Sequence, residues 1–196
     1  MGMEETGCLP EVIIRPYRRA DRDGLYRVAG DTAFFGSPIE AFLEDRRLFL
    51  DAFYRYYTEF EPENSWVAES DCHEVVGFLA GCLDTSRQRR IFSSRLVPDA
   101  LWGAITGRCR LGRKTWRYVA GLFREALRGS FPQVDLRAFP AHLHINVDAA
   151  WRGRGVGRKL LLRYFDYLRG EGIQGVHLET TDQNGIACHL YEQLGF

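Results

Sequence analysis

The stretch Arg152-Gly153-Arg154-Gly155-Val156-Gly157 decides the fold, because it joins a strand-like segment to a long helical one. Segment 142–147 before it alternates polar and apolar residues, the period of two that is typical of a strand. In segment 156–168 apolar residues recur at helical spacing, and Gly170 and Gly172 predict the helix end. A glycine-rich turn leading into a helix offers unpaired N–H groups and the positive end of the helix dipole. We therefore expect an anion site that suits a pyrophosphate.

Three kinds of glycine-rich anion site compete for this turn. A Walker loop needs a glycine before its lysine, whereas Arg158 precedes Lys159 here, and no serine or threonine follows. A dinucleotide fingerprint, G-x-G-x-x-G, belongs near the start of a βαβ unit, whereas this G-x-G-x-G lies three-quarters of the way along the chain. The third pattern, R-x-x-G-x-G, is met by Arg152, Gly155 and Gly157. Alternatively, the glycines merely start a helix.

A second motif follows in register. Asn184, Ala187 and the run Leu190-Tyr191-Glu192-Gln193-Leu194-Gly195-Phe196 give the pattern N-x-x-A-x-x-x-Y-E-x-x-G-F. Between the two motifs, Val176, Leu178 and Thr180 alternate with polar residues and predict a strand. Order and spacing over residues 141–196 resemble the coenzyme A turn and the C-terminal signature of the GNAT acetyltransferases.

The rest of the chain fits the element order of that family. Strands are predicted at 12–16, 65–69 and 75–80, the last two as a hairpin. Helices are predicted from the Asp21 cap to Gly30, and from Pro38 to near Pro62. The resemblance implies an α/β GNAT fold: a mixed central sheet with splayed fourth and fifth strands, helices on both faces, and a helical insert between the third and fourth strands. We expect residues 1–196 to form a single domain.

Composition bounds the remaining classes of function. The chain has 196 residues, a hydrophobic content of 45% and a net charge of zero. Its apolar stretches are far shorter than the roughly 18 residues of a membrane span, and its start lacks the features of a secretory signal. The five cysteines are widely spaced, which favours free thiols in a reducing compartment. We expect a cytoplasmic protein with no membrane partner.

Two further segments narrow the resemblance. Residues 60–85 and 139–145 resemble the acetyltransferase-like branch related to the C-terminal domain of O-GlcNAcases and its free-standing bacterial relatives. A chain of this branch can keep the fold and the coenzyme site without being a proven catalyst. A coenzyme-binding or interaction module without transfer activity therefore stands as the alternative to an enzyme.

The insert at 86–140 is basic. It carries twelve Arg or Lys against three Asp or Glu, about +9 in a neutral chain. It is either a cationic lid that attracts an anionic acceptor, a partner or the coenzyme phosphates, or a solvated face whose arginines pair with acids elsewhere. It shows no recognisable nucleic-acid-binding module, so we expect no nucleic-acid partner. Apolar residues predict two or three helices with one buried face each. They are Leu96, Leu101, Trp102, Ile105, Val119, Leu122, Phe123 and Leu127.

The resemblance implies roles for named residues. Main-chain groups of Ile145 and Val147 would bind the pantetheine arm of acetyl-CoA, and Asn184 would steady the coenzyme near its thiol. Tyr191 matches the general acid that protonates the departing thiolate; alternatively, it packs near Phe196. The pyrophosphate would lie in the turn formed by Arg152, Gly153, Arg154, Gly155, Val156, Gly157 and Arg158.

The general base has no fixed position in this family. His142, His144 and Asn146 share one face of the predicted strand, next to the expected thioester. We expect His144 to be the base, and His142 and Asn146 to contact the acceptor, although either histidine is equally explained as a buried, hydrogen-bonded strand residue. Asp84, also placed among the acceptor-binding residues, and Glu179 are alternative bases. We expect His177 and His189 to be structural, and no metal.

The sequence therefore predicts an N-acetyltransferase that moves the acetyl group of acetyl-CoA to an amine by direct attack in a ternary complex. The acceptor is predicted to be a small molecule, with a protein amine as the alternative. The resemblance also implies one more strand after Phe196. Without it the fifth strand would keep an open edge, which makes a homodimer a reasonable expectation.

Overall fold

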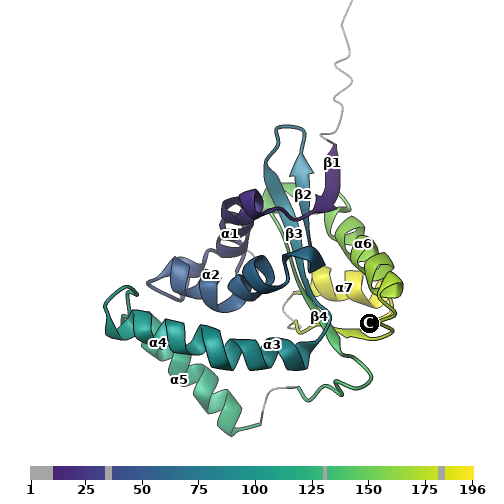
Figure 1. Ribbon diagram of the computed structural model, residues 1–196. Coiled ribbons are helices and arrows are strands. Elements are labelled where there is room, and N and C mark those ends of the chain that lie inside the picture. Colours follow the sequence, from purple (N-terminus) through teal and green to yellow (C-terminus); the bar gives the residue numbers. More distant parts are fainter. Residues whose placement is uncertain (1–10, 34–36, 130–131, 181–183) are drawn as a thin grey trace, which may run out of the picture.

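A five-stranded sheet forms the centre of the computed structural model, which describes residues 11–33, 37–129, 132–180 and 184–196 (Figure 1). Its strands lie in chain order and pair antiparallel, except for the last pair, which is parallel. They are β1 (Val12–Pro16), β2 (Ser65–Ser70), β3 (Val75–Cys82), β4 (Ala141–Val147) and β5 (Val176–His177).

The last two strands part soon after they meet. β5 pairs with β4 only at Ala141–Val176 and His142–His177. From Leu143 onward, no described strand pairs with β4 on that side, which confirms the predicted splay. The strand expected from Val176 to Thr180 is thus shorter than predicted, because the parting of the strands leaves Leu178 and Thr180 with no described strand to pair with.

Helices cover both faces of the sheet, as predicted. In Figure 1, α1 (Arg22–Asp31) and α2 (Arg46–Arg55) lie on one side, and α6 (Val156–Gly170) and α7 (Gly185–Gln193) on the other. Each face has its own core. Phe78 and Ala80 of β3 pack with the α1 and α2 residues, whereas Leu79 packs with α6. Every residue of β3 is buried, because successive side chains enter opposite cores.

One predicted helix starts later than expected. Pro38 precedes only a 3₁₀ turn, Ile39–Ala41, and α2 begins at Arg46. The Asp45 carboxylate accepts a hydrogen bond from the Leu48 N–H at 3.0 Å, which makes Asp45 the N-cap. The helix then widens into a π turn at Tyr56–Phe60 and ends before the 3₁₀ turn Pro62–Asn64.

The insert is helical, as predicted. It contains α3 (Thr85–Ile91), a π turn (Phe92–Leu96), α4 (Val97–Ile105) and α5 (Arg113–Leu127). The expectation of one buried face per helix was wrong for seven of the eight apolar positions, because no described element packs over them. Leu96 alone is buried.

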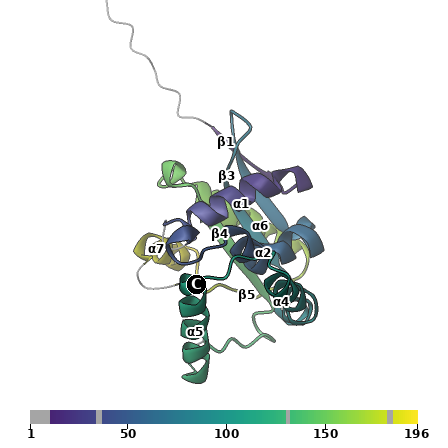
Figure 2. The same ribbon diagram turned by 90° about the vertical axis from the view of Figure 1, so that its left-hand side faces the viewer.

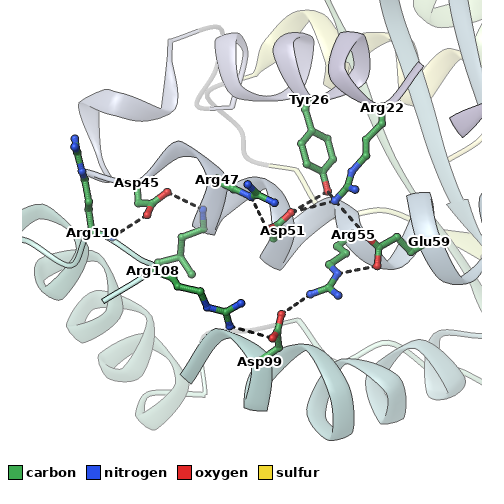
Figure 3. A network of polar contacts seen from close by, with 11 residues as sticks. Arg22, Tyr26, Asp45, Arg47, Asp51, Arg55, Glu59, Asp99, Arg108 and Arg110 are labelled. Carbon is green, nitrogen blue, oxygen red and sulfur yellow. Dashed lines mark hydrogen bonds and ion pairs between the residues drawn. The ribbon is translucent and has the colours of Figure 1, made fainter. Parts of the chain in front are cut away.

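Ion pairs tie the insert to α2 (Figure 3). Asp99 of α4 accepts from Arg55 at 2.5 Å and from Arg108 at 3.3 Å, and Arg55 also pairs with Glu59 at 2.8 Å. Arg87 pairs with Glu61 outside the insert. Among these pairs, Arg87 meets an acid elsewhere in the chain, as the solvated-face interpretation predicts, whereas Arg108 meets Asp99 within the insert.

Candidate functional site

The glycine turn before α6 takes a conformation that needs glycine. Gly153 and Gly155 have φ angles of 73° and 74°, in the left-handed region. Gly155 is the N-cap of α6, and no side chain caps this helix in the described chain. The first N–H groups of α6 therefore stay available for a ligand, with the positive end of the helix dipole behind them.

The arginines of the turn lie at its rim. Arg152 donates from Nε to the Val147 carbonyl at 3.1 Å, which ties the turn to the end of β4. The Arg154 guanidinium lies 5.1 Å from the centre of the Trp151 ring, a cation–π contact that holds it in the turn. Arg158 is exposed on the first turn of α6.

Three predicted regions meet at Gly157. A methyl group added to Gly157 would lie 3.4 Å from Leu190 of α7 and 3.9 Å from Ile145 of β4. The start of α6, the parted stretch of β4 and the helix that carries Tyr191 are therefore neighbours. In the same order, these three regions are the ones predicted to bind the pyrophosphate, bind the pantetheine arm and protonate the thiolate.

Two predicted residues lie on α7. Asn184 is its N-cap residue, but its side chain makes no capping hydrogen bond. Tyr191 is half-buried and meets Phe196 edge to face at 5.8 Å, so both the packing role and access from solvent are compatible with its position. Burial raises the pKa of Tyr191 to about 12, which keeps its phenol protonated at neutral pH.

The other face of β4 carries the two histidines, and His142 is engaged at both ring nitrogens. Tyr57 Oη lies 2.6 Å from Nε2, and Thr85 Oγ1 lies 2.6 Å from Nδ1. The single hydroxyl hydrogen of Thr85 is donated to the Pro140 carbonyl at 2.7 Å. Nδ1 must therefore be the donor to Thr85, and Nε2 the acceptor from Tyr57. Burial lowers the pKa of His142 to about 3, in line with this neutral ring.

The same threonine closes the insert. Both the N–H and the hydroxyl of Thr85 donate to the Pro140 carbonyl, at 2.9 Å and 2.7 Å. The start and the end of the insert thus meet at one carbonyl oxygen, immediately beside His142.

His144 differs from its neighbour. It is packed against Tyr54 and Tyr57, with ring centroids 5.8 Å and 5.3 Å away, yet it has no hydrogen bond to any described residue. Burial lowers its pKa to about 4, so the imidazole is neutral at pH 7. It lies on β4 where β5 has already parted, and none of the described residues bonds to the ring nitrogen that would accept a proton.

Asn146 and Asp84 hold the structure together. The Asn146 amide donates to Thr32 Oγ1 at 2.8 Å and accepts from Tyr54 at 3.3 Å, which joins β4 to α1 and α2. Asp84 is the N-cap of α3 and accepts from the Arg87 N–H at 3.0 Å. Their predicted contacts with an acceptor stay predictions.

The sequence reasoning missed the partners of the polar face. Tyr54, Tyr57 and Thr32 lie far from β4 in the chain, so no local motif signals them. Thr85 had a weak signal, since it stands next to Asp84 in one of the segments that carried the family resemblance.

Another hollow lies away from the glycine turn. It has a volume of about 590 Å³, lies beside the start of α5, and its wall holds the acids Glu40 and Glu44 together with Arg110 and Lys114. Within the described ranges, no group of His, Cys, Asp and Glu is arranged to hold a metal ion. None of the helices described is both long and apolar enough to cross a bilayer.

Comparison with solved structures finds a protein with the same fold as this chain. The protein in "Crystal structure of SsHAT" superposes with a TM-score of 0.76 and 30% identity, covering 95% of this chain and 91% of that one. A five-stranded mixed sheet with a parted parallel pair and an open glycine turn thus places the chain in the acetyltransferase class of α/β domains.

Sequence comparison supplies the family. The model of the acetyltransferase (GNAT) family matches residues 111–196. Mycothiol acetyltransferase of Nocardiopsis dassonvillei is 44% identical over 52 residues, which are 26% of this chain and 16% of that protein. N-alpha-acetyltransferase RimI of Mycobacterium tuberculosis is 46% identical over 52 residues, or 26% of this chain and 31% of that one. The matched stretch thus spans less than a third of either relative. The chain belongs to the GNAT acetyltransferase family; the narrower resemblance to O-GlcNAcase domains stays a prediction.

Proposed function

We propose that the chain binds acetyl-CoA and transfers its acetyl group to an amine, by direct attack in a ternary complex. The observation that carries this proposal is the uncapped N-terminus of α6, which lies next to the parted stretch of β4. The pyrophosphate would occupy the turn from Arg152 to Arg158, and the pantetheine arm would pair with the freed main chain of Ile145 and Val147.

The chemistry needs a proton acceptor on one side of the thioester and a proton donor on the other. As the amine nitrogen bonds to the acetyl carbon and the carbon–sulfur bond breaks, the nitrogen becomes strongly acidic. His144, although a weak base, suffices to take that proton. The departing thiolate takes a proton from the Tyr191 phenol. Each lies on a different face of the sheet, so the thioester would pass between them through the gap between β4 and β5.

The acceptor is proposed to be a small amine. The relatives are named for mycothiol and for an α-amino group, which represent a small molecule and a chain terminus. His144, half-buried beside the buried rings of Tyr54 and Tyr57, is the group of that face that a small amine would approach. A protein amine is the second acceptor class.

Thermal shift with acetyl-CoA and with CoA tests the first half of the proposal. Ligand binding should raise the melting temperature with the logarithm of concentration over Kd, and the double variant Arg154→Glu, Gly155→Glu should abolish the rise. A well-folded protein that shows no rise at all would refute coenzyme binding.

Amine-dependent release of CoA thiol tests the second half. Tyr191→Phe should lower kcat by roughly 10²-fold or more, and His144→Gln by a similar factor. Tyr167→Phe, a half-buried tyrosine on the same side of the sheet, should leave kcat unchanged. Coenzyme binding without thiol release for any amine would instead favour the inactive coenzyme-binding module.

A further inference from the structure

The exposed apolar surface of the protein is concentrated in the insert. Of the sixteen large hydrophobic residues exposed in the described chain, nine fall within residues 101–127. Scattered exposed apolar residues are ordinary, but a cluster of this kind marks an interaction surface. The nine are Leu101, Trp102, Ile105, Leu111, Trp116, Val119, Leu122, Phe123 and Leu127.

α5 separates these residues from its charges. Trp116, Val119, Phe123 and Leu127 recur at intervals of three and four, so they form one stripe along the helix. Phe123 and Leu127 are 66% and 74% exposed, and Trp116 is 61% exposed. A second stripe beside the first holds the arginines of the helix. They are Arg113, Arg117 and Arg124, with Arg128 at the C-cap.

The helix is held firmly at one end and projects at the other. The Glu44 carboxylate accepts from the Lys114 and Thr115 N–H groups at 2.7 Å and 2.9 Å, and from the Thr115 hydroxyl at 2.5 Å. Beyond Thr115, every residue of α5 is half-buried or exposed, and Tyr118 is the half-buried residue that packs against the core formed with α1 and α2. Figure 2 shows α5 extending below the layers of sheet and helices. A fifteen-residue helix with so few packed residues is marginal in water, so its apolar stripe calls for a partner.

Charge decides between partners. If two copies packed their α5 stripes together, the arginine stripes would come side by side, with only Glu125 as an acid on each helix. A surface rich in anionic lipid headgroups complements the same helix, since it accepts Trp, Phe and Leu at its apolar boundary and attracts Arg to its phosphates. The insert carries about +9 and the rest of the chain about −9, so attraction would also orient the molecule with α5 toward the lipid.

We propose that α5 is a membrane-surface helix, which lies on an anionic lipid bilayer with Trp116, Phe123 and Leu127 in the headgroup region and its arginines at the phosphates. A helix that lies on the membrane surface differs from a segment that spans the bilayer. The proposal runs against the expectation of no membrane partner, because that expectation rested only on the lack of a stretch long enough to span the bilayer.

Flotation of the full chain with vesicles tests the proposal without reference to acetyl transfer. Vesicles of equal parts phosphatidylcholine and phosphatidylglycerol should carry the protein, vesicles of phosphatidylcholine alone should carry much less, and added salt should release it. Tryptophan fluorescence should shift to the blue on the anionic vesicles, and Trp116→Phe should remove much of that shift.

Variants identify the surface. Phe123→Ala should weaken binding about tenfold, through the apolar area it no longer buries. Arg117→Gln and Arg124→Gln should each weaken it about fivefold. Ile13→Ala, at an equally exposed position on β1, and Arg163→Gln, at an exposed position on α6, are the matched controls and should bind as the wild type does.

Two results would overturn the proposal. One is a folded protein that stays with neither kind of vesicle, or that binds both equally and without salt dependence. The other is a lipid-free dimer that Phe123→Ala converts to a monomer, since the stripe would then belong to a second copy.

Discussion

Helices α5 and α6 have the same length, fifteen residues each, and the same kind of amphipathic pattern, yet they end in opposite surroundings. In α6 the apolar stripe is buried against the sheet, and Leu160 is fully buried. In α5 the corresponding stripe faces solvent, and Leu127 is 74% exposed. Their N-termini are also opposite: a carboxylate occupies that of α5, and that of α6 is open.

The comparison teaches that an amphipathic pattern predicts a helix and its apolar face, but not the partner of that face. The chain itself supplies the partner of α6 through β3 and β4. For α5 it supplies the Glu44 carboxylate at the N-terminus, the Glu40 carbonyl that accepts from Lys114, and a core contact for Tyr118, whereas the apolar stripe itself stays exposed. The same pattern thus stabilises the fold in one place and leaves a surface for binding in the other.

The largest expected difference between α6 and α5 is the loss of stability when a leucine of the apolar stripe is replaced by alanine. Leu160→Ala in α6 should lower the free energy of unfolding by about 2–5 kcal/mol, because it opens a cavity in a packed core. Leu127→Ala in α5 should change it by less than about 0.5 kcal/mol. Urea unfolding measures both, and equal losses would show that α5 is packed in solution.

Acid should affect the sheet before it affects α5. Because burial holds the pKa of His142 near 3 and that of His144 near 4, both stay neutral in the folded state at pH 5, whereas the unfolded chain takes up protons below about pH 6.5. The contribution of each neutral histidine to the free energy of unfolding is therefore fully present above about pH 6.5. It decreases as the pH falls, by about 2 kcal/mol for each histidine at pH 5. Urea midpoints at pH 7 and pH 5, in the wild type and in His144→Gln, measure the loss.

The hydrogen bonds between Glu44 and the start of α5 should persist from pH 7 to pH 5. Hydrogen bonds from Thr115 and backbone N–H groups hold the pKa of Glu44 at about 2. A lowered carboxyl pKa stabilises the fold above the unfolded value, and that contribution disappears as the pH falls from about 4.5 toward 2. Amide exchange of Lys114 and Thr115 should stay slow at pH 5, and exchange as fast as in Glu44→Gln would contradict this order of events.

Replacing a glycine with alanine should change the stability of the protein in opposite directions in α6 and α5. At Gly155, with φ at 74°, alanine is strained and should destabilise the protein by about 1–2 kcal/mol. At Gly121 in α5 nothing lies within 4 Å of an added methyl group, so alanine should stabilise by about 0.5–1 kcal/mol through helix propensity. Thermal unfolding measures both, and a loss at Gly121 would reveal a partner in contact there.

The smallest expected effect concerns the ion pairs between α4 and α2. Asp99→Asn removes the negative charge that pairs with Arg55 and Arg108, whose side chains are 30% and 58% exposed. We expect a slight drop in the melting temperature that vanishes at high salt. A double-mutant cycle with Arg55→Gln gives the coupling, and a coupling that persists in salt would show a buried pair.

The order of elements was predictable because each has a local cause. Alternation defined β4, glycines bounded α6, and Asp21 marks the N-cap position of α1, where its side chain makes no capping hydrogen bond. The start of α2 was not predictable from Pro38, because the structure places the N-cap at Asp45, whose carboxylate accepts from the Leu48 N–H. The short β5 follows from the parting of the strands, which no periodicity encodes.

The candidate site divides in the same way. The coenzyme turn lies in one continuous segment, so its motif could be read directly. The bonds that fix the His142 tautomer come from Tyr57 and Thr85, which the fold brings together across 85 and 57 positions of the chain. Such partners decide whether a histidine can act as a base or is a hydrogen-bonded strand residue. In the sequence pattern alone, His142 and His144 are equivalent.

Thr85 and Pro140 make the insert a nearly closed ring on the body. Its ends meet at one carbonyl oxygen, and the entropy of closing a loop depends only slowly on the length of the loop. The length between the two residues can therefore change at little entropic cost, while Leu96 and Tyr118 show which side chains of the insert also pack against the core. A short turn grafted between these two residues would give a minimal version of the domain, from which the contribution of everything outside that ring can be measured alone.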